Sequence, residues 1–124
     1  MALNETNTYV PESAFVGTMP VYSEPDTFAS GAVVAARTVV GRITASKKLV
    51  KAVKTATDGS QKPVGIAVRD VDASAADAVG PVYKAGAFDP TKLVIDPSFT
   101  ADDVRLAFEG TPLFIRTPLS LTTL

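Results

Sequence analysis

The sequence predicts a mainly β domain of the small α+β kind, with one short C-terminal helix and an extended N-terminal arm. Short runs of alternating apolar residues recur between turn residues along most of the chain. Only residues 99–110 carry the spacing of an amphipathic helix. The first 36 residues contain three prolines, no lysine or arginine and no sustained hydrophobic period. Strands therefore form the domain, and an irregular arm precedes it.

Composition limits both the architecture and the chemistry. The 124 residues suit one domain with an arm, and the net charge of −1 provides no general attraction to nucleic acid or to an anionic membrane. No apolar run approaches the ~20 residues that a membrane-spanning helix needs. The chain contains no cysteine and no histidine, which removes disulfides, thiolate metal sites and the commonest general base. Catalysis would have to depend on carboxylates, lysine or hydroxyl groups.

We expect an arm over residues 1–36, a β-rich domain over residues 37–117 and a short C-terminal tail over residues 118–124. The arm carries four aromatic side chains, namely Tyr9, Phe15, Tyr22 and Phe28. A purely solvated segment does not normally carry so many, so we expect the arm to become ordered against a partner. The alternative is that it packs on its own domain.

The clearest strand signal lies in residues 57–71. Asp58 and Gly59 favour a turn, and Pro63 fixes φ at a strand entrance, where its missing N–H costs least. The alternation predicts one bulky face, formed by Val64, Ile66 and Val68. The opposite face carries Gly65 and Ala67, which would let a neighbouring element approach closely. We expect the rest of the domain to be built around this strand.

Other segments show weaker strand signals between turn residues. They are residues 35–44, 49–54, 79–88, 92–96 and 112–117. The first two are predicted to form a hairpin through the turn at residues 45–48. Pro81 predicts an edge or a bulge in the third segment, and Gly86 predicts a bend.

The helix predicted over residues 99–110 has signals at both ends. Thr100 can serve as the N-cap, and Asp103 completes a capping-box-like pair. Val104 and Phe108 lie four residues apart and share one helix face, while Gly110 occupies a C-terminal cap position. Capping explains the aspartates of the first turn without catalysis.

Four lysines between residues 47 and 54 allow two interpretations. They could form a nucleic-acid patch, or they could belong to a solvated hairpin whose lysines discourage edge-to-edge pairing. No aromatic residues are interleaved for base stacking, and the overall charge balance is acidic. The solvated hairpin is therefore the preferred interpretation.

The carboxylates Asp70, Asp72 and Asp77 invite a calcium or a hydrolase hypothesis. An EF-hand loop starting at Asp70 would need glycine at its sixth position and glutamate at its twelfth, and the chain has Ala75 and Pro81 there. The chain also lacks a Gly-x-Ser-x-Gly elbow, a phosphate-binding loop and a dinucleotide fingerprint. We assign no catalytic residue, no metal ligand and no cofactor, and an exposed turn is the preferred interpretation of this loop.

The order of the segments resembles a known family. The residues that carry the resemblance are Tyr9-Val10-Pro11, Phe28-Ala29-Ser30-Gly31, residues 37–44, residues 57–66, residues 82–88 and the helix over residues 100–109 with the strand that follows it to Arg116. Together they resemble the head decoration proteins of tailed bacteriophages, the family typified by the lambda decoration protein. No single motif is diagnostic, but the ordered set is specific.

The resemblance implies a structural protein and not an enzyme. It implies a compact β-clip domain that forms homotrimers on the outer surface of the virion, after synthesis in the host cytoplasm. The trimers would occupy three-fold and quasi-three-fold positions of the expanded capsid and stabilise it by bridging copies of the major capsid protein. No nucleic acid, membrane or cofactor is expected as a partner. The alternative is a small β-domain binding module on the virion, such as an adhesin for a glycan or a receptor.

The resemblance also implies that the arm binds the capsid by adding a strand to the major capsid protein. The capsid-binding residues expected here are Thr6, Asn7, Thr8, Tyr9, Val10, Pro11, Phe15 and Phe28. This arm is longer than that of the lambda protein, and the chain continues beyond Arg116.

Overall fold

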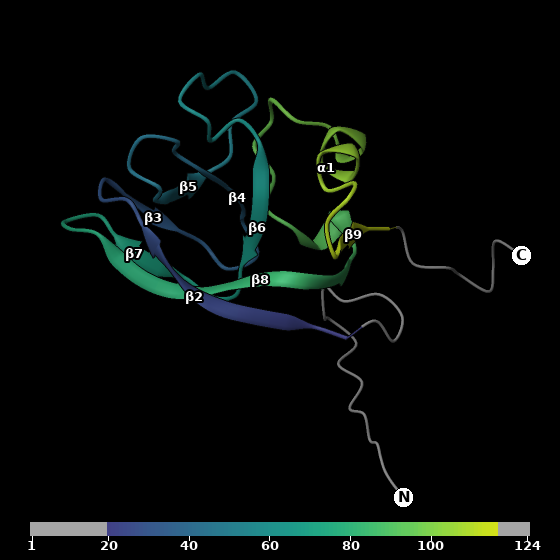
Figure 1. Ribbon diagram of the computed structural model, residues 1–124, viewed down its shortest axis with the longest axis horizontal. Helices are drawn as coiled ribbons and strands as arrows, with labels where there is room; N and C mark the ends of the chain where they lie inside the picture. The colour runs from purple at the N-terminus through teal and green to yellow at the C-terminus, as the bar shows by residue number, and fades with distance from the viewer. Residues whose placement is uncertain (1–19, 117–124) are drawn as a thin grey trace, which may run out of the picture.

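Strands dominate residues 20–116, which are the part of the chain that the computed structural model describes (Figure 1). The elements in chain order are β2 (Tyr22–Phe28), β3 (Ala32–Val34), β4 (Val39–Arg42), β5 (Leu49–Lys51), β6 (Pro63–Ala67), β7 (Val71–Ala73), β8 (Ala78–Phe88), the 3₁₀ turn η1 (Pro90–Lys92), α1 (Ala101–Ala107) and β9 (Leu113–Ile115). The expected mainly β fold with one helix is confirmed. The described residues contain no helix long and apolar enough to cross a membrane.

The main sheet is closed on itself along most of its length. Its strand order is β2-β5-β4-β6-β8-β9, and β2 pairs with β8 as well as with β5, so five strands form a ring. The strand β9 extends the sheet beyond this ring by pairing in parallel with β8. The pair β3 and β7 forms a small second sheet, which lies at the opposite end of the molecule from α1 and β9 (Figure 1).

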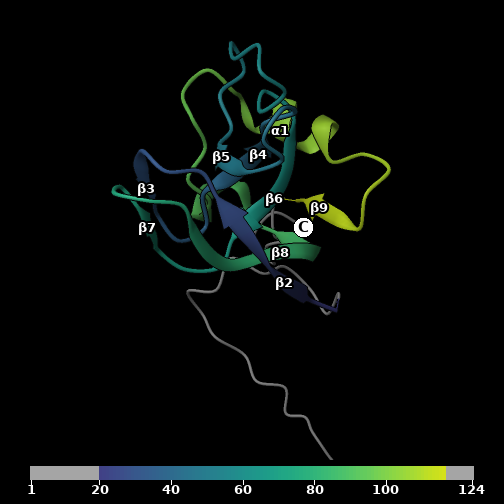
Figure 2. The ribbon, with the colours of Figure 1, turned by 60° about the vertical axis from the view of Figure 1, so that its left-hand side comes forward.

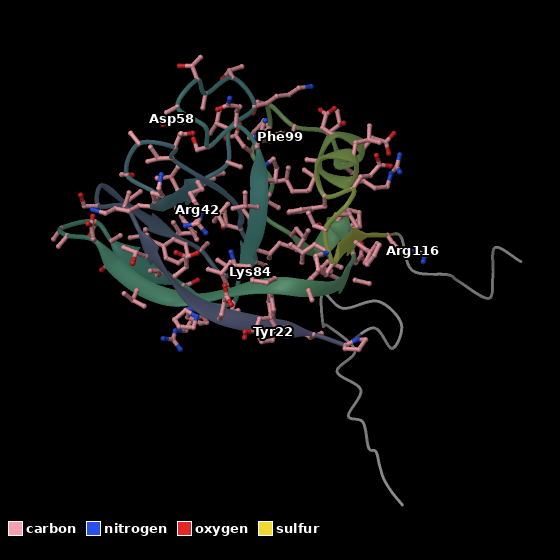
Figure 3. All side chains as sticks on the ribbon, viewed as in Figure 1. Tyr22, Arg42, Asp58, Lys84, Phe99 and Arg116 are labelled. Carbon is pink, nitrogen blue, oxygen red and sulfur yellow. The ribbon has the colours of Figure 1, made fainter. Side chains whose placement is uncertain are left out.

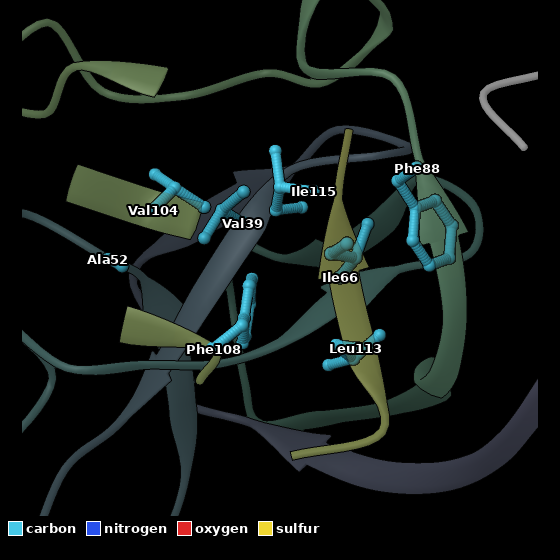
Figure 4. Close-up of a cluster of buried hydrophobic side chains, with 8 residues drawn as sticks. All are labelled: Val39, Ala52, Ile66, Phe88, Val104, Phe108, Leu113 and Ile115. Atoms are coloured by element: carbon cyan, nitrogen blue, oxygen red, sulfur yellow. The ribbon is translucent and has the colours of Figure 1, made fainter. Parts of the chain in front are cut away.

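Successive side chains of the ring strands point to opposite faces of the sheet, so apolar residues form two hydrophobic cores, one on each face. The inner cluster consists of Phe28, Val34, Val40, Leu49, Ala67, Val71, Ala73 and Val82, and it draws side chains from each of the five ring strands. The outer cluster, drawn in Figure 4, consists of Val39, Ala52, Ile66, Phe88, Val104, Phe108, Leu113 and Ile115. Each fully buried apolar side chain of this size contributes about 1.5–3 kcal/mol. The outer cluster therefore holds α1 and β9 against the ring.

The strand predicted within residues 57–71 is confirmed as β6, between β4 and β8. Gly59 has a φ of +103° in the preceding turn. A Cβ at Gly65 would lie 2.6 Å from Val82 Cγ1, so the small face does let β8 approach closely. One detail differs. Because Val40 pairs with Gly65 and Gly41 pairs with Pro63, Val64 is the extra residue of a bulge and packs beside the inner cluster, whereas Ile66 belongs to the outer one.

The predicted hairpin over residues 35–54 is present but shorter than expected. The strands β4 and β5 pair antiparallel, with Val40 opposite Lys51 and Arg42 opposite Leu49. The strand starts at residue 39 because Arg37 has a left-handed φ of +64°. Its N–H donates to the Ala67 carbonyl at 2.7 Å, which turns the chain into the ring.

The long strand β8 contains the irregularity predicted from its glycine but not the one predicted from its proline. Pro81 lies opposite Pro25 of β2. Neither residue has an N–H to donate, so the pair must occupy a position without ladder hydrogen bonds, which alternate in antiparallel strands. Gly86 has a φ of +139°, and the register between β2 and β8 shifts beside it, at Tyr22 and Ser23. The irregularity predicted at Gly86 is present, but the edge or bulge predicted at Pro81 is not. Pro81 lies in regular pairing between β2 and β6, and the extra residue of the bulge is Lys84.

The predicted helix cap is confirmed in detail. The Asp103 N–H donates to Thr100 Oγ1 at 3.1 Å, and the Thr100 N–H donates to Asp103 Oδ2 at 3.0 Å. Val104 and Phe108 are buried in the outer cluster. The cap thus positions α1 over the ring.

The short strand predicted over residues 92–96 is wrong. Asp89 accepts hydrogen bonds from the Thr91 backbone and side chain, and Pro90 opens a 3₁₀ turn that ends at Lys92. Within the described residues, only an isolated bridge between Thr38 and Val94 remains of the expected pairing. The local aspartate turn competes successfully with strand formation.

The boundary predicted after residue 36 also needs correction for the residues that the structure describes. Residues 22–34, predicted as arm, contain β2 and β3. β2 pairs with β8 from Tyr22 to Phe28, and Phe28 lies in the inner cluster. These residues follow the alternative in which the segment packs on its own domain. Residues 1–19 and 117–124 lie outside the described part of the chain.

Candidate functional site

Most of the predicted capsid-binding residues lie outside the part of the chain that the structure describes. These are Thr6, Asn7, Thr8, Tyr9, Val10, Pro11 and Phe15. Phe28 is described, and its exposed fraction is 0%. It packs in the inner cluster and cannot also serve as a surface anchor, so this assignment needs correction. The structure instead describes where the arm joins the domain.

The arm joins the domain at β2, which is held along both of its edges. β2 lies alongside β8 in both views of the molecule, and its other edge meets β5 where Phe28 pairs with Leu49 (Figures 1 and 2). Buried Phe28 fixes the C-terminal end of the strand. A load applied to residues before Pro20 is therefore transmitted to a strand that is part of the ring.

A cluster of three charged side chains, Asp26, Arg42 and Lys84, links β2 to β4 and β8. Figure 3 labels Arg42 and Lys84. The Asp26 carboxylate accepts hydrogen bonds from Arg42 Nη2 at 2.6 Å and Nη1 at 3.2 Å, and Lys84 Nζ lies 3.6 Å away. Burial alone would raise the pKa of Asp26, but the hydrogen bonds from Arg42 and from the Thr27 N–H outweigh it and hold the pKa below its usual value. Asp26 consequently stays ionised and binds β4 and β8 to β2.

Apolar side chains are exposed where β2 begins. Val21 and Tyr22 have exposed fractions of 43% and 57%. A Cβ at Gly86 would lie 3.4 Å from Val21 Cγ2, so Val21 lies against the end of β8. On the other side of β8, Phe114 of β9 has an exposed fraction of 43%. Exposed apolar surface therefore lies on β9 and beside the point where the described chain begins.

The lysines of the hairpin are largely neutralised by aspartates. Lys48 pairs with Asp77, and Lys54 Nζ lies 3.0 Å from Asp103 Oδ2. A third pair joins Lys51 and Asp96 at 3.7 Å. These partners fit the solvated hairpin better than a nucleic-acid surface, since a phosphate backbone would have to compete with carboxylates already in place.

The carboxylates of the hydrolase hypothesis have structural partners. Asp70 accepts a hydrogen bond from the Ala36 N–H at 2.7 Å. Hydrogen bonds from Ser74 lower the pKa of Asp72, and a hydrogen bond from Lys48 lowers the pKa of Asp77. A general acid near neutral pH needs the opposite shift. Residues 20–116 also contain no group of three or more acidic, histidine or cysteine side chains that could hold a metal ion.

One comparison with known proteins decides the family. The family model described as bacteriophage lambda head decoration protein D matches residues 6–112. The chain belongs to this head decoration family. A search of curated proteins found no match.

Membership in the head decoration family makes the chain a structural protein of the phage virion, associated with the capsid. The match includes both residues 6–19 and the domain. It therefore covers most of the predicted arm and the strand that holds it.

Sequence reasoning missed the charged cluster that fixes β2 in this head decoration protein. Asp26, Arg42 and Lys84 are separated by 16 and 42 positions in the sequence, and no local period connects them. One sequence signal could have indicated the cluster. Asp26 lies within residues 22–28, a segment that the sequence predicts as arm but that contains strand-forming residues. An acidic side chain at a partly buried strand position needs a cationic partner.

Proposed function

We propose that the protein cements the phage head. It binds the outside of the expanded capsid as homotrimers at three-fold and quasi-three-fold positions and stabilises the shell. Residues before β2 add a strand to the major capsid protein. Membership in the head decoration family supports this function, and the firm attachment of β2 supports a mechanical role for the residues that precede it.

The energetics of strand addition indicate which residues supply the affinity. Ordering one residue costs about 1–2 kcal/mol of backbone entropy, and a ladder hydrogen bond returns about 0.5–1.5 kcal/mol. The backbone hydrogen bonds of an added strand therefore contribute little or no net binding free energy by themselves. Burial of Tyr9, Val10 and Phe15 would add about 1.5–3 kcal/mol for each side chain. Phe28 no longer belongs to this set, because it is already buried within its own domain.

A trimer increases the effect of each arm. Three arms on one rigid assembly engage with a high effective concentration, so modest affinities multiply. A protein that binds only the expanded shell stabilises that shell by mass action. Sedimentation equilibrium of the free protein should give three times the 12.9 kDa mass of the chain. A monomer mass both in solution and on the shell would contradict the trimer.

Deleting the arm tests the function directly. The deletion should end before Pro20, because removing residues up to 30 would also remove β2 and Phe28 from the ring. We expect the variant lacking residues 2–19 to keep its thermal unfolding transition and to bind expanded heads at least about tenfold more weakly in a co-sedimentation assay. A matched control is the double variant S13A/T18A, which changes the same segment outside the expected capsid-binding residues and should bind nearly as the natural chain does. Unchanged binding of the deletion variant would refute the arm mechanism.

A further inference from the structure

The Asp58–Gly59 peptide lies in the turn before β6 (Figure 3) and is held at both of its ends. The Asp58 carbonyl accepts a hydrogen bond from the Thr44 N–H at 2.9 Å, and the Gly59 N–H donates to Gln61 Oε1 at 2.8 Å. Gly59 has a φ of +103°, and a Cβ there would overlap Thr44 Oγ1. The turn is therefore fixed against the chain that leaves β4, with no room for a larger residue at Gly59.

The Asp58 side chain is held as well. Its Oδ1 accepts hydrogen bonds from the Ser60 N–H at 3.0 Å and from Ser60 Oγ at 2.5 Å. These two bonds lower the pKa of Asp58, so the carboxyl is ionised near neutral pH. Ser60 is buried, and its carbonyl packs against Gly41, which leaves the two donors little freedom to move away.

The sequence makes this peptide the most reactive aspartyl link of the chain. Aspartate isomerises most readily before glycine, because a residue without a side chain lets its nitrogen approach the aspartate side chain. Asp58–Gly59 is the only Asp-Gly or Asn-Gly pair in the 124 residues. Of the other eight aspartates, Asp89 and Asp96 precede proline, which has no N–H to lose, and six precede residues with a side chain.

We propose that the Asp58–Gly59 peptide is a site of spontaneous isomerisation to isoaspartate, and that the hydrogen bonds of its turn prevent the reaction in the folded protein. In this reaction the Gly59 nitrogen forms a bond to Asp58 Cγ, and the side-chain hydroxyl leaves with the proton of that nitrogen as water. Water then opens the succinimide ring at the main-chain carbonyl of Asp58, so the chain runs through Cγ and the former peptide carbonyl becomes a carboxyl group. A water molecule is lost and another is regained, so the mass of the chain does not change. This goes beyond the proposed function and does not depend on it, because it concerns the domain alone.

Each contact of the turn opposes a particular part of ring closure. The nitrogen must give up the proton that it now donates to Gln61. Asp58 must carry a proton, because a hydroxyl is the leaving group, whereas the two donors of Ser60 favour the ionised carboxylate. The carboxyl must also turn from Ser60 toward the Gly59 nitrogen. Ring closure therefore requires local opening of the turn, and its rate follows the population of the open form.

Isomerisation would loosen the turn permanently. It inserts a methylene group into the main chain between residues 58 and 59, and it converts the carbonyl that binds the Thr44 N–H into a carboxylate. The side-chain carbonyl carbon that carries the acceptor for Ser60 becomes part of the main chain. We therefore expect the isomerised protein to unfold at a lower urea concentration than the natural chain.

Peptide mapping of the full-length protein tests the proposal. Folded protein and protein unfolded in urea are incubated at about 37 °C and about pH 6, and we expect isoaspartate to form at least about tenfold faster in the unfolded chain. Trypsin releases the peptide of residues 55–69, in which Asp58 is the only aspartate. Asp-N protease cleaves this peptide before aspartate but not before isoaspartate, which gives the isomerised fraction.

Three variants show whether the protection is local. Q61A removes the acceptor of the Gly59 N–H and should raise the rate in the folded protein at least about threefold. K62A changes the neighbouring exposed side chain and should leave the rate unchanged. V104A truncates a buried side chain of the outer cluster and weakens the whole domain without touching the turn, so it should also leave the rate unchanged.

Four results would each overturn the proposal. Equal rates in the folded and unfolded chains would show that the fold gives no protection. An unchanged rate in Q61A would show that the hydrogen bond to Gln61 does not restrain the peptide. A rise in K62A or V104A as large as that in Q61A would show that the contacts of the turn do not control the rate. Isoaspartate that forms mainly at another aspartate of the unfolded chain would show that a different peptide is the reactive one.

Discussion

Asp26 is the charged side chain that connects β2 to β4 and β8. Its two oxygens bind the Arg42 guanidinium, and Lys84 lies within ion-pair distance. The side chains of Asp26 and Arg42 are 18% and 32% exposed, so solvent screens the interaction only partly. Hydrogen bonds between charged groups contribute more to stability than neutral ones when they are partly protected from water.

The variant D26N should therefore lower the free energy of unfolding by about 1–2 kcal/mol. Asparagine keeps the shape but loses the charge that holds Arg42 and Lys84. Urea denaturation at pH 7 measures the change. The matched control is D102N on α1, whose side chain is 79% exposed and whose pair with Arg105 is long, so its effect should stay below about 0.5 kcal/mol. Equal effects of the two variants would contradict the role assigned to Asp26.

Three aspartates share one local arrangement that makes stability depend on pH. Asp58, Asp72 and Asp96 each accept hydrogen bonds from the hydroxyl and the N–H of the serine two residues later, and these bonds lower the pKa of each carboxyl. A carboxyl with a lowered folded-state pKa binds fewer protons when folded than when unfolded. Its contribution is complete above the unfolded pKa of about 3.9 and is lost as the pH falls through the folded value.

We therefore expect the urea midpoint to be level between about pH 7 and pH 5 and to fall steadily below about pH 4. The triple variant D58N/D72N/D96N keeps an acceptor at each turn but has no titrating group there, so its profile should fall less steeply. A midpoint that rises on acidification, or an identical slope in the triple variant, would show that these turns do not control the pH dependence.

The contact between β4 and the loop before β6 depends on the absence of a side chain. A Cβ at Gly41 would overlap the Ser60 carbonyl, which is backbone and buried. A Cβ at Gly65 would instead meet a methyl group of Val82, which can shift by a small rotation.

The variant G41A should consequently lose about 3 kcal/mol of unfolding free energy, and G65A about 1–2 kcal/mol. Thermal unfolding of both variants under the same conditions shows which variant loses more unfolding free energy. A larger loss of unfolding free energy in G65A than in G41A would contradict this order. It would show that the Ser60 backbone shifts more easily than the Val82 side chain.

Elements with a strong local pattern could be predicted, and those that depend on distant partners could not. The strand β6, the irregularity of β8 at Gly86, and the capping box of α1 follow from turn residues, glycine and short-range periodicity, whereas the bulge predicted at Pro81 lies at Lys84 instead. The strand expected over residues 92–96 failed because the turn at Asp89 and Pro90 captured its start. The bulge places Val64 beside the inner cluster instead of on the face of Ile66. It arises from the pairing of β6 with β4, so the alternation within β6 alone could not predict it.

The limit is clearest at β2. Its proline, lack of cations and weak alternation are typical of an arm, yet β8 pairs with it from end to end. The paired residues of β8 lie 50 to 63 positions away in the sequence, and the facing prolines Pro25 and Pro81 are acceptable because their pair needs no hydrogen bond between β2 and β8. For the candidate site, the sequence identified the family but misassigned Phe28, whose burial depends on the closure of the whole ring.

The whole molecule combines a closed ring of strands with a segment that the ring holds at β2. The net charge is −1, and three of the four hairpin lysines are already paired with aspartates. Binding to a shell should therefore depend on apolar anchors and strand pairing more than on charge. Occupancy of expanded heads should change less than about threefold between about 50 and 300 mM salt, measured by co-sedimentation. A steep loss over this range would indicate an electrostatic interface.

The most direct test of head decoration is electron cryomicroscopy of expanded, undecorated heads mixed with the full-length protein. We expect protruding trimers on the outer surface at three-fold and quasi-three-fold positions, bound through the proposed arm. We also expect continuous density from the start of β2 to an added strand on the major capsid protein. Heads that remain bare at saturating protein would contradict the decoration function. Trimers bound without density connecting β2 to the shell would contradict the arm mechanism.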